Sequence, residues 1–145
     1  MATKWEDKFS VGVSEIDAQH KRLFSLVDNI EQLSTKHKGE LIKNFKEIVK
    51  VIDELGDYSV THFYSEEMAM DECKCPEAED HKKKHEVFVD EINNIRENLT
   101  ENKLFQTDES KLEELVNRLY TFLTKWLTSH ILVVDMKYKG KIREL

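Results

Sequence analysis

Histidines are the residues of this sequence whose type and placement point most directly to chemistry. The chain contains six of them, and five fall on the apolar stripe of a predicted helix. If about a third of the positions on an amphipathic helix face the core, chance would place all five there about 0.4% of the time. The five are His20, His62, His81, His85 and His130, whereas His37 falls on a polar helix end.

A single buried histidine is most often a structural residue whose two ring nitrogens are hydrogen-bonded. Five buried histidines would need about ten donors and acceptors, and a core of Leu, Ile and Phe cannot supply them. A metal ion would satisfy one nitrogen of each ring. The sequence therefore predicts that these five imidazoles bind metal.

Two carboxylates join the histidines on the same stripes. Glu66 follows His62 by four residues and so shares its helix face, whereas Glu67, one step round, is predicted on a shoulder or the surface. Asp135 follows His130 by five residues, an awkward rotation of about 140° on a regular helix. We therefore expect an irregularity or a helix end between His130 and Asp135. Since a buried carboxylate needs a cation, both are candidate metal ligands.

The number and type of these seven ligands narrow the class of site. Structural zinc sites usually have four ligands, largely cysteines. Ferritin-like sites use Glu-x-x-His pairs, which precede none of these histidines. If both carboxylates bridge two octahedral metals together with an oxide or hydroxide, one coordination position stays open. Imidazoles with carboxylates suit iron, although the ligand types also permit copper or zinc.

Four helical stretches position these ligands. The apolar periodicity predicts helices at about 17–38 and 40–70, a third from Pro76 and a fourth from about 108–110, with Gly39 as a C-terminal cap. Each stretch carries at least one candidate ligand. The short connections after the first two favour antiparallel neighbours. We predict an all-α, up-down-up-down antiparallel four-helix bundle with an N-terminal arm.

Length and composition suit one helical domain. The 145 residues predict a single domain over 1–145, with an arm at about 1–15, a bundle at about 16–138 and a short basic C-terminal tail. One Pro and four Gly leave little turn chemistry for a many-stranded β fold. The arm is expected to pack on the bundle through Trp5, Phe9, Val11 and Val13.

Charge and hydropathy exclude several partners. The chain has 22 basic and 29 acidic residues, a net charge of −7, which argues against nucleic acid binding. The lysine-rich segments 82–84 and 137–143 are short and are predicted to be solvated. No apolar run approaches about 18 residues, so no transmembrane helix is predicted. The N-terminus lacks the apolar region of a signal peptide, and we expect a cytoplasmic protein.

Nearly the whole chain resembles the hemerythrin family, most closely its single-domain bacterial members. The segments that carry the resemblance are Trp5 to Val13, Ile16 to Phe24 around Gln19-His20, His62 to Met70, His81 to Phe88, and Trp126 to Asp135. The resemblance implies a four-helix bundle around a non-haem centre of two iron ions (Fe2+/Fe3+) with a bridging oxo or hydroxo group.

The resemblance also implies a role for each site residue. One iron would be held by His81, His85 and His130, the other by His20 and His62, and the bridges would be Glu66 and Asp135. Dioxygen would bind at the iron that has two histidines. The residues that line the oxygen pocket in the family correspond to Leu23, Phe63, Trp126 and Ile131, which are equally typical of ordinary core packing.

The function implied is reversible dioxygen binding, for storage, delivery or scavenging. The four pocket positions contain no ionisable side chain, which favours a binding protein over an enzyme. In the di-ferric state the centre keeps a net positive charge, so we expect it to bind small anions. The alternatives are a redox enzyme that reduces peroxide or nitric oxide, an oxygen or redox sensor acting through a partner, and a structural metal bundle.

The two cysteines depart from the family pattern. The family usually has Tyr-Pro before the third helix, whereas this chain has Cys75-Pro76, with Cys73 two residues earlier. The favoured prediction is two reduced thiols in a loop, and the alternatives are a redox-responsive pair or a labile metal site. A disulfide across Cys-x-Cys would close a very tight loop, which argues against it.

Overall fold

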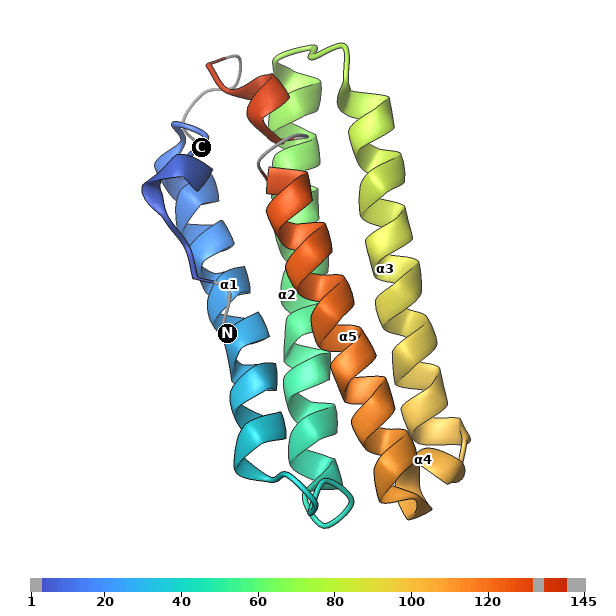
Figure 1. Cartoon of the computed structure of the whole chain (residues 1–145). Helices are drawn as coiled ribbons and strands as arrows, with labels where there is room; N and C mark the ends of the chain where they lie inside the picture. Colours follow the sequence, from blue (N-terminus) through green and yellow to red (C-terminus); the bar gives the residue numbers. More distant parts are fainter. Residues whose placement is uncertain (1–3, 132–134, 141–145) are drawn as a thin grey trace.

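Four long helices lie side by side and alternate in direction (Figure 1). The computed structural model describes residues 4–131 and 135–140, and within these ranges every regular element is helical. The long helices are α1 (Ser14–Lys36), α2 (Phe45–Glu72), α3 (Ala78–Glu101) and α5 (Glu109–Ser129). The short elements are α4 (Leu104–Thr107) and the 3-10 turns η1 (Asp7–Phe9) and η3 (Asp135–Tyr138). The predicted all-α, antiparallel four-helix bundle is confirmed.

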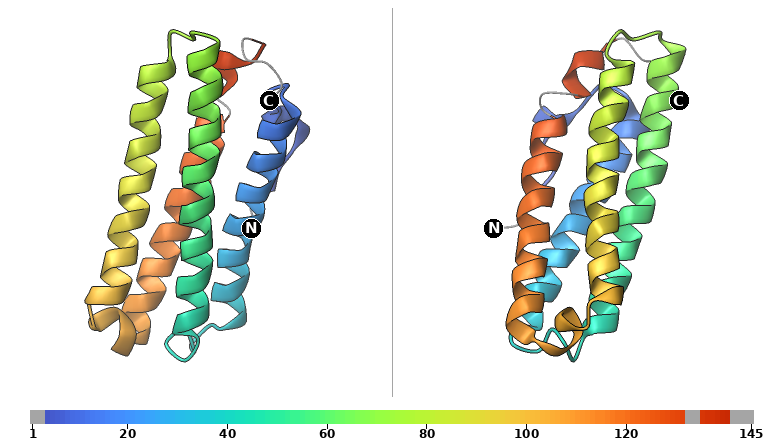
Figure 2. Two further views of the ribbon diagram at one scale, coloured as in Figure 1. Left: turned by 180° about the vertical axis from the view of Figure 1, so that it is seen from behind. Right: turned by 90° about the vertical axis from the view of Figure 1, so that its right-hand side faces the viewer.

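The helices pack by their apolar stripes. α2 lies between α1 and α3, and α5 closes the bundle against both of them (Figure 2). On α5 the stripe consists of Leu112, Leu115, Leu119 and Leu123, each at most 3% exposed. Burying each of these side chains is worth about 1.5–3 kcal/mol. No helix in the part of the chain that the structure describes is long and apolar enough to cross a membrane.

The N-terminal arm is tied to the start of α1. Asp17, which the sequence suggested as the first residue of the helix, accepts hydrogen bonds from the Ser10 hydroxyl at 2.5 Å and the Val11 amide at 2.9 Å. The helix itself begins three residues earlier, at Ser14. The arm packs on the bundle as predicted, since Phe9, Val11 and other apolar arm residues are buried.

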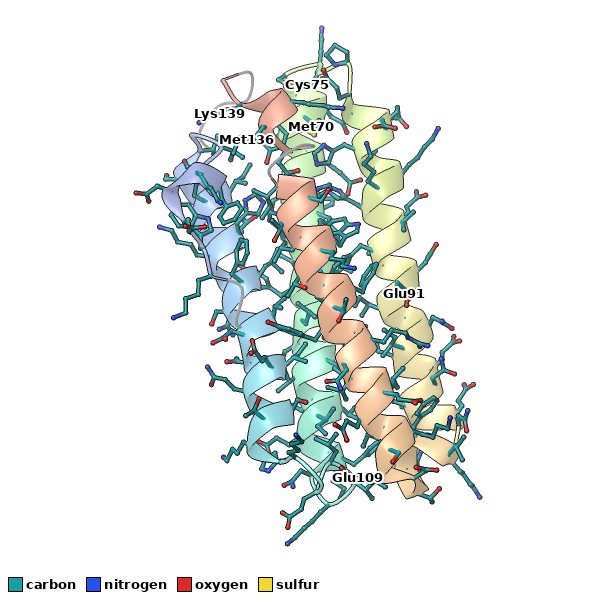
Figure 3. The ribbon with its side chains drawn as sticks, viewed as in Figure 1. Met70, Cys75, Glu91, Glu109, Met136 and Lys139 are labelled. Carbon is teal, nitrogen blue, oxygen red and sulfur yellow. A yellow bond between two sulfur atoms is a disulfide. The ribbon has the colours of Figure 1, made fainter. Side chains whose placement is uncertain are left out.

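A distant carboxylate delays the start of α2. The helix was predicted from about residue 40 but begins at Phe45. The amides of Leu41 and Ile42 donate to the carboxylate of Glu109 at 2.8 and 3.0 Å (Figure 3 labels Glu109 at this end). Because a residue of α5 accepts these hydrogen bonds, the segment stays a turn. Gly39 has a φ of 81° in this turn, beyond the end of α1 rather than as its cap.

Side chains accept hydrogen bonds from backbone amides at the starts of α4 and α5, but α3 has no side-chain cap at its start. α3 begins at Ala78, two residues after Pro76, where the prediction started it. The Asp108 carboxylate accepts from the Lys111 amide at 3.2 Å, so the predicted cap at the start of α5 is present. The extra turn α4 was not predicted, and the Asn102 side chain accepts from the Leu104 amide at its start.

The turn between α2 and α3 corrects the prediction for the cysteines, because Cys73 and Cys75 form a disulfide. Lys74 adopts a left-handed φ of 56°. The amides of Lys74 and Cys75 then donate back to the carbonyls of Asp71 and Met70, a Schellman motif. This turn places the two cysteine Cα atoms 5.3 Å apart, a normal disulfide separation. The sequence hid the motif because a lysine stands where glycine is usual.

We expect reduction of this disulfide to lower the melting temperature by about 2–8 °C. Closing so short a loop stabilises the fold by only about 1–2 kcal/mol, and about 2–4 °C follows from each kcal/mol at this chain length. Calorimetry with and without a phosphine reductant, which binds iron poorly, measures the shift. The Cys73→Ser variant is the control and should not respond to the reductant. Two free thiols found by alkylation before reduction would contradict the assignment.

The core consists of two apolar clusters at different levels of the bundle. The larger one fills the middle and lower part and includes Leu23, Ile52, Phe88 and Leu119. The end cluster is formed by Val11, Val13, Ile16, Ala69, Met70, Cys75, Ala78 and Tyr138. Figure 3 labels two of these, Met70 and Cys75, near the α2–α3 turn. The layer between the two clusters is polar, and it contains the predicted ligands.

Candidate metal centre

The structure brings all seven candidate ligands into this one buried layer. Each is at most 4% exposed. His20 comes from α1, His130 caps the C-terminal end of α5 and Asp135 opens η3. The helix therefore ends before Asp135, as the five-residue spacing predicted. The other four ligands come from α2 (His62 and Glu66) and α3 (His81 and His85).

Glu66 lies at the centre of the layer. Its Oε1 atom is 3.1 Å from Nε2 of His62 and 3.3 Å from Nε2 of His85. Its Oε2 atom is 3.6 Å from Nε2 of His20. One carboxylate thus contacts imidazoles from three helices, which is the geometry a bridging ligand needs.

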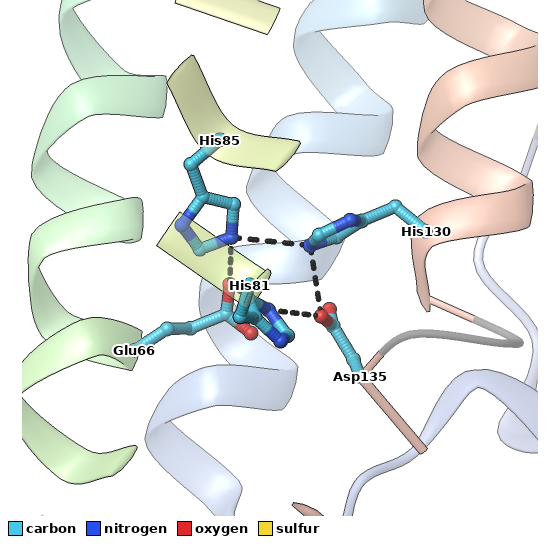
Figure 4. A group of neighbouring side chains, drawn as sticks. All are labelled: Glu66, His81, His85, His130 and Asp135. Carbon is cyan, nitrogen blue, oxygen red and sulfur yellow. Dashed lines mark hydrogen bonds and ion pairs between the residues drawn. The ribbon is translucent and has the colours of Figure 1, made fainter. Parts of the chain in front are cut away.

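Asp135, like Glu66, contacts imidazoles from three helices. Its Oδ1 atom is 2.8 Å from Nε2 of His81 and 2.9 Å from Nε2 of His130 (Figure 4). Its Oδ2 atom is 3.2 Å from Nε2 of His20. The Nε2 atoms of His85 and His130 face each other at 3.1 Å. Ring nitrogens and carboxylate oxygens therefore converge on a common space.

The donor atoms fall into two groups that share Glu66. The first group consists of Glu66, Asp135 and three histidines, and the second consists of Glu66 and two histidines. Within each group the donor atoms lie within 4.8 Å of one another. The histidines of the first are His81, His85 and His130, and those of the second are His20 and His62. This unequal division matches the one that the family resemblance implied.

Outer partners orient two of the imidazoles. Nδ1 of His62 lies 2.7 Å from the side-chain oxygen of Gln19, and Nδ1 of His85 lies 3.2 Å from a carboxylate oxygen of Glu67. An Nδ1–H that donates to these oxygens leaves the Nε2 lone pair directed at the centre. Glu67 does lie on a shoulder of α2, but its contact with His85 could not be read from its position beside Glu66.

A buried tyrosine completes the surroundings of Glu66. The hydroxyl of Tyr138 donates to Oε2 of Glu66, and its side chain is completely buried in the end cluster. Tyr138 lies in the same 3-10 turn as Asp135. The sequence analysis missed it, although its place three residues after a candidate ligand was a signal. It holds one oxygen of Glu66 in a fixed orientation.

The two carboxylates remain ionised in the core. Burial raises the pKa of Glu66, but the imidazoles of His62, His20 and His85 outweigh it and hold the pKa well below the usual value. Burial and the neighbouring Glu66 raise the pKa of Asp135, and the imidazoles around it again prevail and lower it. The layer therefore presents two negative charges to any cation that binds there.

The imidazoles do not all shift in the same direction. Burial disfavours the charged form of His20, but the carboxylates of Asp135 and Glu66, 3.2 and 3.6 Å from its Nε2 atom, raise its pKa to about 9. The pKa of His81 also rises, because Asp135 outweighs burial. For His62 and His130 burial prevails and lowers the pKa. The carboxylates therefore favour the protonated forms of His20 and His81 when no metal is bound.

We therefore expect metal binding at pH 7 to release protons. His20, with a pKa raised to about 9 from 6.5, must deprotonate to become a ligand, so zinc affinity should rise about tenfold per pH unit for each proton between these values. The same proton stabilises the metal-free fold fully below pH 6.5, and that contribution is lost as the pH rises through 9. Calorimetric titration in buffers of different ionisation enthalpy counts the protons. A titration without proton release would contradict this.

The donor set fits a pair of metal ions. Both ring nitrogens of His20 and of His81, Oε1 of Glu66 and both carboxylate oxygens of Asp135 are buried, and although several of them lie within ion-pair distance of one another, none forms a well-aligned hydrogen bond. Buried polar atoms are normally satisfied, so such a group needs an explanation. Imidazole nitrogens with two shared carboxylates are a donor set that iron accepts.

An apolar cavity lies beside the layer. It has a volume of about 10 Å3, room for one very small molecule. The predicted pocket residues Leu23, Phe63 and Trp126 line it, whereas Ile131 is buried elsewhere in the core. Two of the lining rings stack on candidate ligands, Phe63 on His85 at 4.0 Å and Trp126 on His130 at 4.2 Å between ring centroids. The remaining lining residues are Val27, Leu55, Ser59, Phe88, Leu123 and Leu127.

Comparison with known proteins identifies proteins that are similar in sequence and in fold. The profile of the family described as "Hemerythrin HHE cation binding domain" matches residues 11–142. A bacteriohemerythrin of Stenotrophomonas maltophilia is 32% identical over 139 residues, which cover 96% of this chain and 80% of the relative. A bacteriohemerythrin of Clostridium acetobutylicum is 28% identical over 143 residues, covering 92% and 96%. A solved crystal structure of a mutant protein superposes with a TM-score of 0.77 at 25% identity, covering 97% and 98% of the two chains.

Proposed function

Since this chain belongs to the hemerythrin family, we propose that it binds dioxygen reversibly at a pair of iron ions, for storage, delivery or scavenging. The observation that carries the proposal is the unequal division of the buried donors. Three histidines lie on one side of Glu66 and two on the other. The side with fewer protein ligands is the one that can accept an exogenous molecule.

The residues that would hold the irons follow from the contacts. His81, His85 and His130 would bind one ion, His20 and His62 the other, and Glu66 and Asp135 would bridge them. When bound, the iron pair supplies a reducible centre at which dioxygen can be taken up and released. An oxo or hydroxo bridge would complete the set. The di-ferric form would accept small anions at the same position.

The protein around the centre limits what can react there. The cavity beside it is lined by Leu23, Phe63, Trp126 and other apolar side chains, which exclude water. Ser59 is the polar exception in this lining, and its hydroxyl already donates to the Leu55 carbonyl at 2.7 Å. No acid or base among these lining residues can deliver a proton to a bound molecule. This favours a binding protein over a peroxide- or nitric-oxide-reducing enzyme at the same centre.

The decisive experiment is anaerobic loading with ferrous iron. Iron per chain is counted, and absorption spectra are recorded while oxygen is admitted and removed. We expect two irons per chain and a visible band that appears with oxygen and disappears without it. The His37→Ala variant is a matched control, because His37 pairs with Glu47 away from the centre. An immediate, irreversible oxidation would instead favour the redox enzyme.

A further inference from the structure

Several large apolar side chains of α2 face solvent. Val60, Tyr64 and Met68 occupy every fourth position of α2 and are 51%, 65% and 54% exposed. Met68, and Val87 of the adjacent α3, which is 60% exposed, lie outside the lining of the groove between the two helices. The two helices lie side by side over their whole length (Figure 2). Single exposed apolar residues are normal, but Val60 and Tyr64 are neighbours on one face of α2 and both line that groove.

A groove of about 270 Å3 runs between the two helices. Val60 and Tyr64 form one wall, and Val89 lies on the other. At its base are Phe63 and His85, whose rings stack at 4.0 Å and are 3% and 2% exposed. Two other surface hollows, one beside Tyr58 and one beside Phe45, include no candidate ligand. The α2–α3 groove therefore leads to the metal centre.

A single imidazole separates the groove from the centre. The carboxylate of Glu67, whose side chain is 28% exposed, reaches from the groove to Nδ1 of His85 at 3.2 Å. On its other edge the same ring places Nε2 3.3 Å from Glu66 and 3.1 Å from His130. All seven candidate ligands are nearly inaccessible, so electrons must cross protein to reach them. The His85 ring offers the shortest such crossing from this groove.

The groove has an excess of negative charge. Glu67, Glu86 and Asp90 line it together with a single cation, Lys82. The Lys82 ammonium already pairs with Asp71 at 3.1 Å, outside the groove lining. Within the described chain, Glu86 and Asp90 form no ion pair. An apolar strip with an acidic rim fits a partner whose apolar contact patch is surrounded by basic residues.

Building on the iron pair proposed above, we propose that this groove docks a one-electron redox protein whose haem or flavin edge is apolar and ringed by lysines. Such a partner would return the oxidised centre to its oxygen-binding state. Each encounter would oxidise the partner by one electron. Two encounters would supply the two electrons that return a di-ferric pair to the di-ferrous state, and one solvent proton would be taken up. A transient contact of this kind needs only a small interface.

The first test measures docking without iron chemistry. The isotope-labelled, iron-free protein is titrated with cytochrome c, a lysine-ringed haem protein, and followed by NMR. We expect weak, salt-sensitive binding, with shifted amides in the α2–α3 groove. Shifts confined to another face would overturn the proposal. So would sedimentation showing that a second copy of this chain covers the groove.

The second test uses charge reversal in matched pairs. The Glu86→Lys/Asp90→Lys double variant should weaken cytochrome c binding about tenfold, and should slow reduction of the di-ferric protein by the hexaammineruthenium(II) cation by a similar factor. Glu97→Lys/Glu101→Lys makes the same charge change on α3 outside the groove and should leave both within about twofold. Equal losses in the two variants would overturn the docking site. If the protein bound cytochrome c in the groove but failed to load two irons, the proposed oxygen-binding function would be overturned, and electron delivery to the iron pair with it.

Discussion

Replacing Glu66 by glutamine is expected to abolish binding of the metal pair, leaving at most one metal per chain and no oxygen-dependent spectrum. Glu66 is the one residue shared by both donor groups. Glutamine preserves its size, but it removes a buried charge and turns an acceptor toward His62 and His85 into a donor. Changing an outer partner of a metal ligand typically costs about 10–100-fold in affinity, so loss of a shared ligand should cost more. Elemental analysis and absorption spectra measure the result.

The neighbouring residue provides the matched control. Glu67→Gln makes the same chemical change one position along α2, but it touches only the outer nitrogen of His85. It should keep two metals per chain with affinity reduced by about 10–100-fold. If Glu66→Gln retained both metals while Glu67→Gln lost them, the assignment of inner and outer residues would be wrong.

Removing the metal is expected to lower the melting temperature by about 8–16 °C. Seven buried polar side chains separate two apolar clusters, and several of their atoms form no well-aligned hydrogen bond. A ligand present at about a thousand times its dissociation constant stabilises the fold by about 4 kcal/mol, and each kcal/mol is worth about 2–4 °C here. Calorimetry before and after chelation measures the loss, and adding metal back should reverse it.

The Glu66→Gln variant separates this effect from general damage by the chelator. Chelator should lower its melting temperature by clearly less than that of the wild type, because it no longer holds the pair. A loaded wild-type protein that melted at the temperature of the stripped one would show that the layer is stable without metal. That result would contradict the view that binding energy contributes to folding here.

Local periodicity was sufficient to predict the four helices and the histidine-rich face. A helix repeats every 3.6 residues, so His62 and Glu66, or His81 and His85, share a face whatever surrounds them. The five-residue step from His130 to Asp135 conflicted with that period and correctly predicted the end of α5. The cap at Asp108 could also be predicted locally, because the Asp108 carboxylate and the Lys111 amide lie within one helical turn.

What the sequence by itself determined, then, was the set of side chains on each helix face, because helical geometry is a property of neighbours along the chain. Only the tertiary structure decided which faces meet. Helix packing brings Glu109 into contact with the start of α2, Glu67 with His85, and Tyr138 with Glu66. The residues in these three contacts are 18 to 72 positions apart in the sequence. The Cys73–Cys75 disulfide is different, because a turn within residues 70–75 closes it, and the sequence analysis missed that turn because a lysine takes the left-handed conformation usual for glycine. The other three contacts depend on how the helices pack, and no local pattern encodes that.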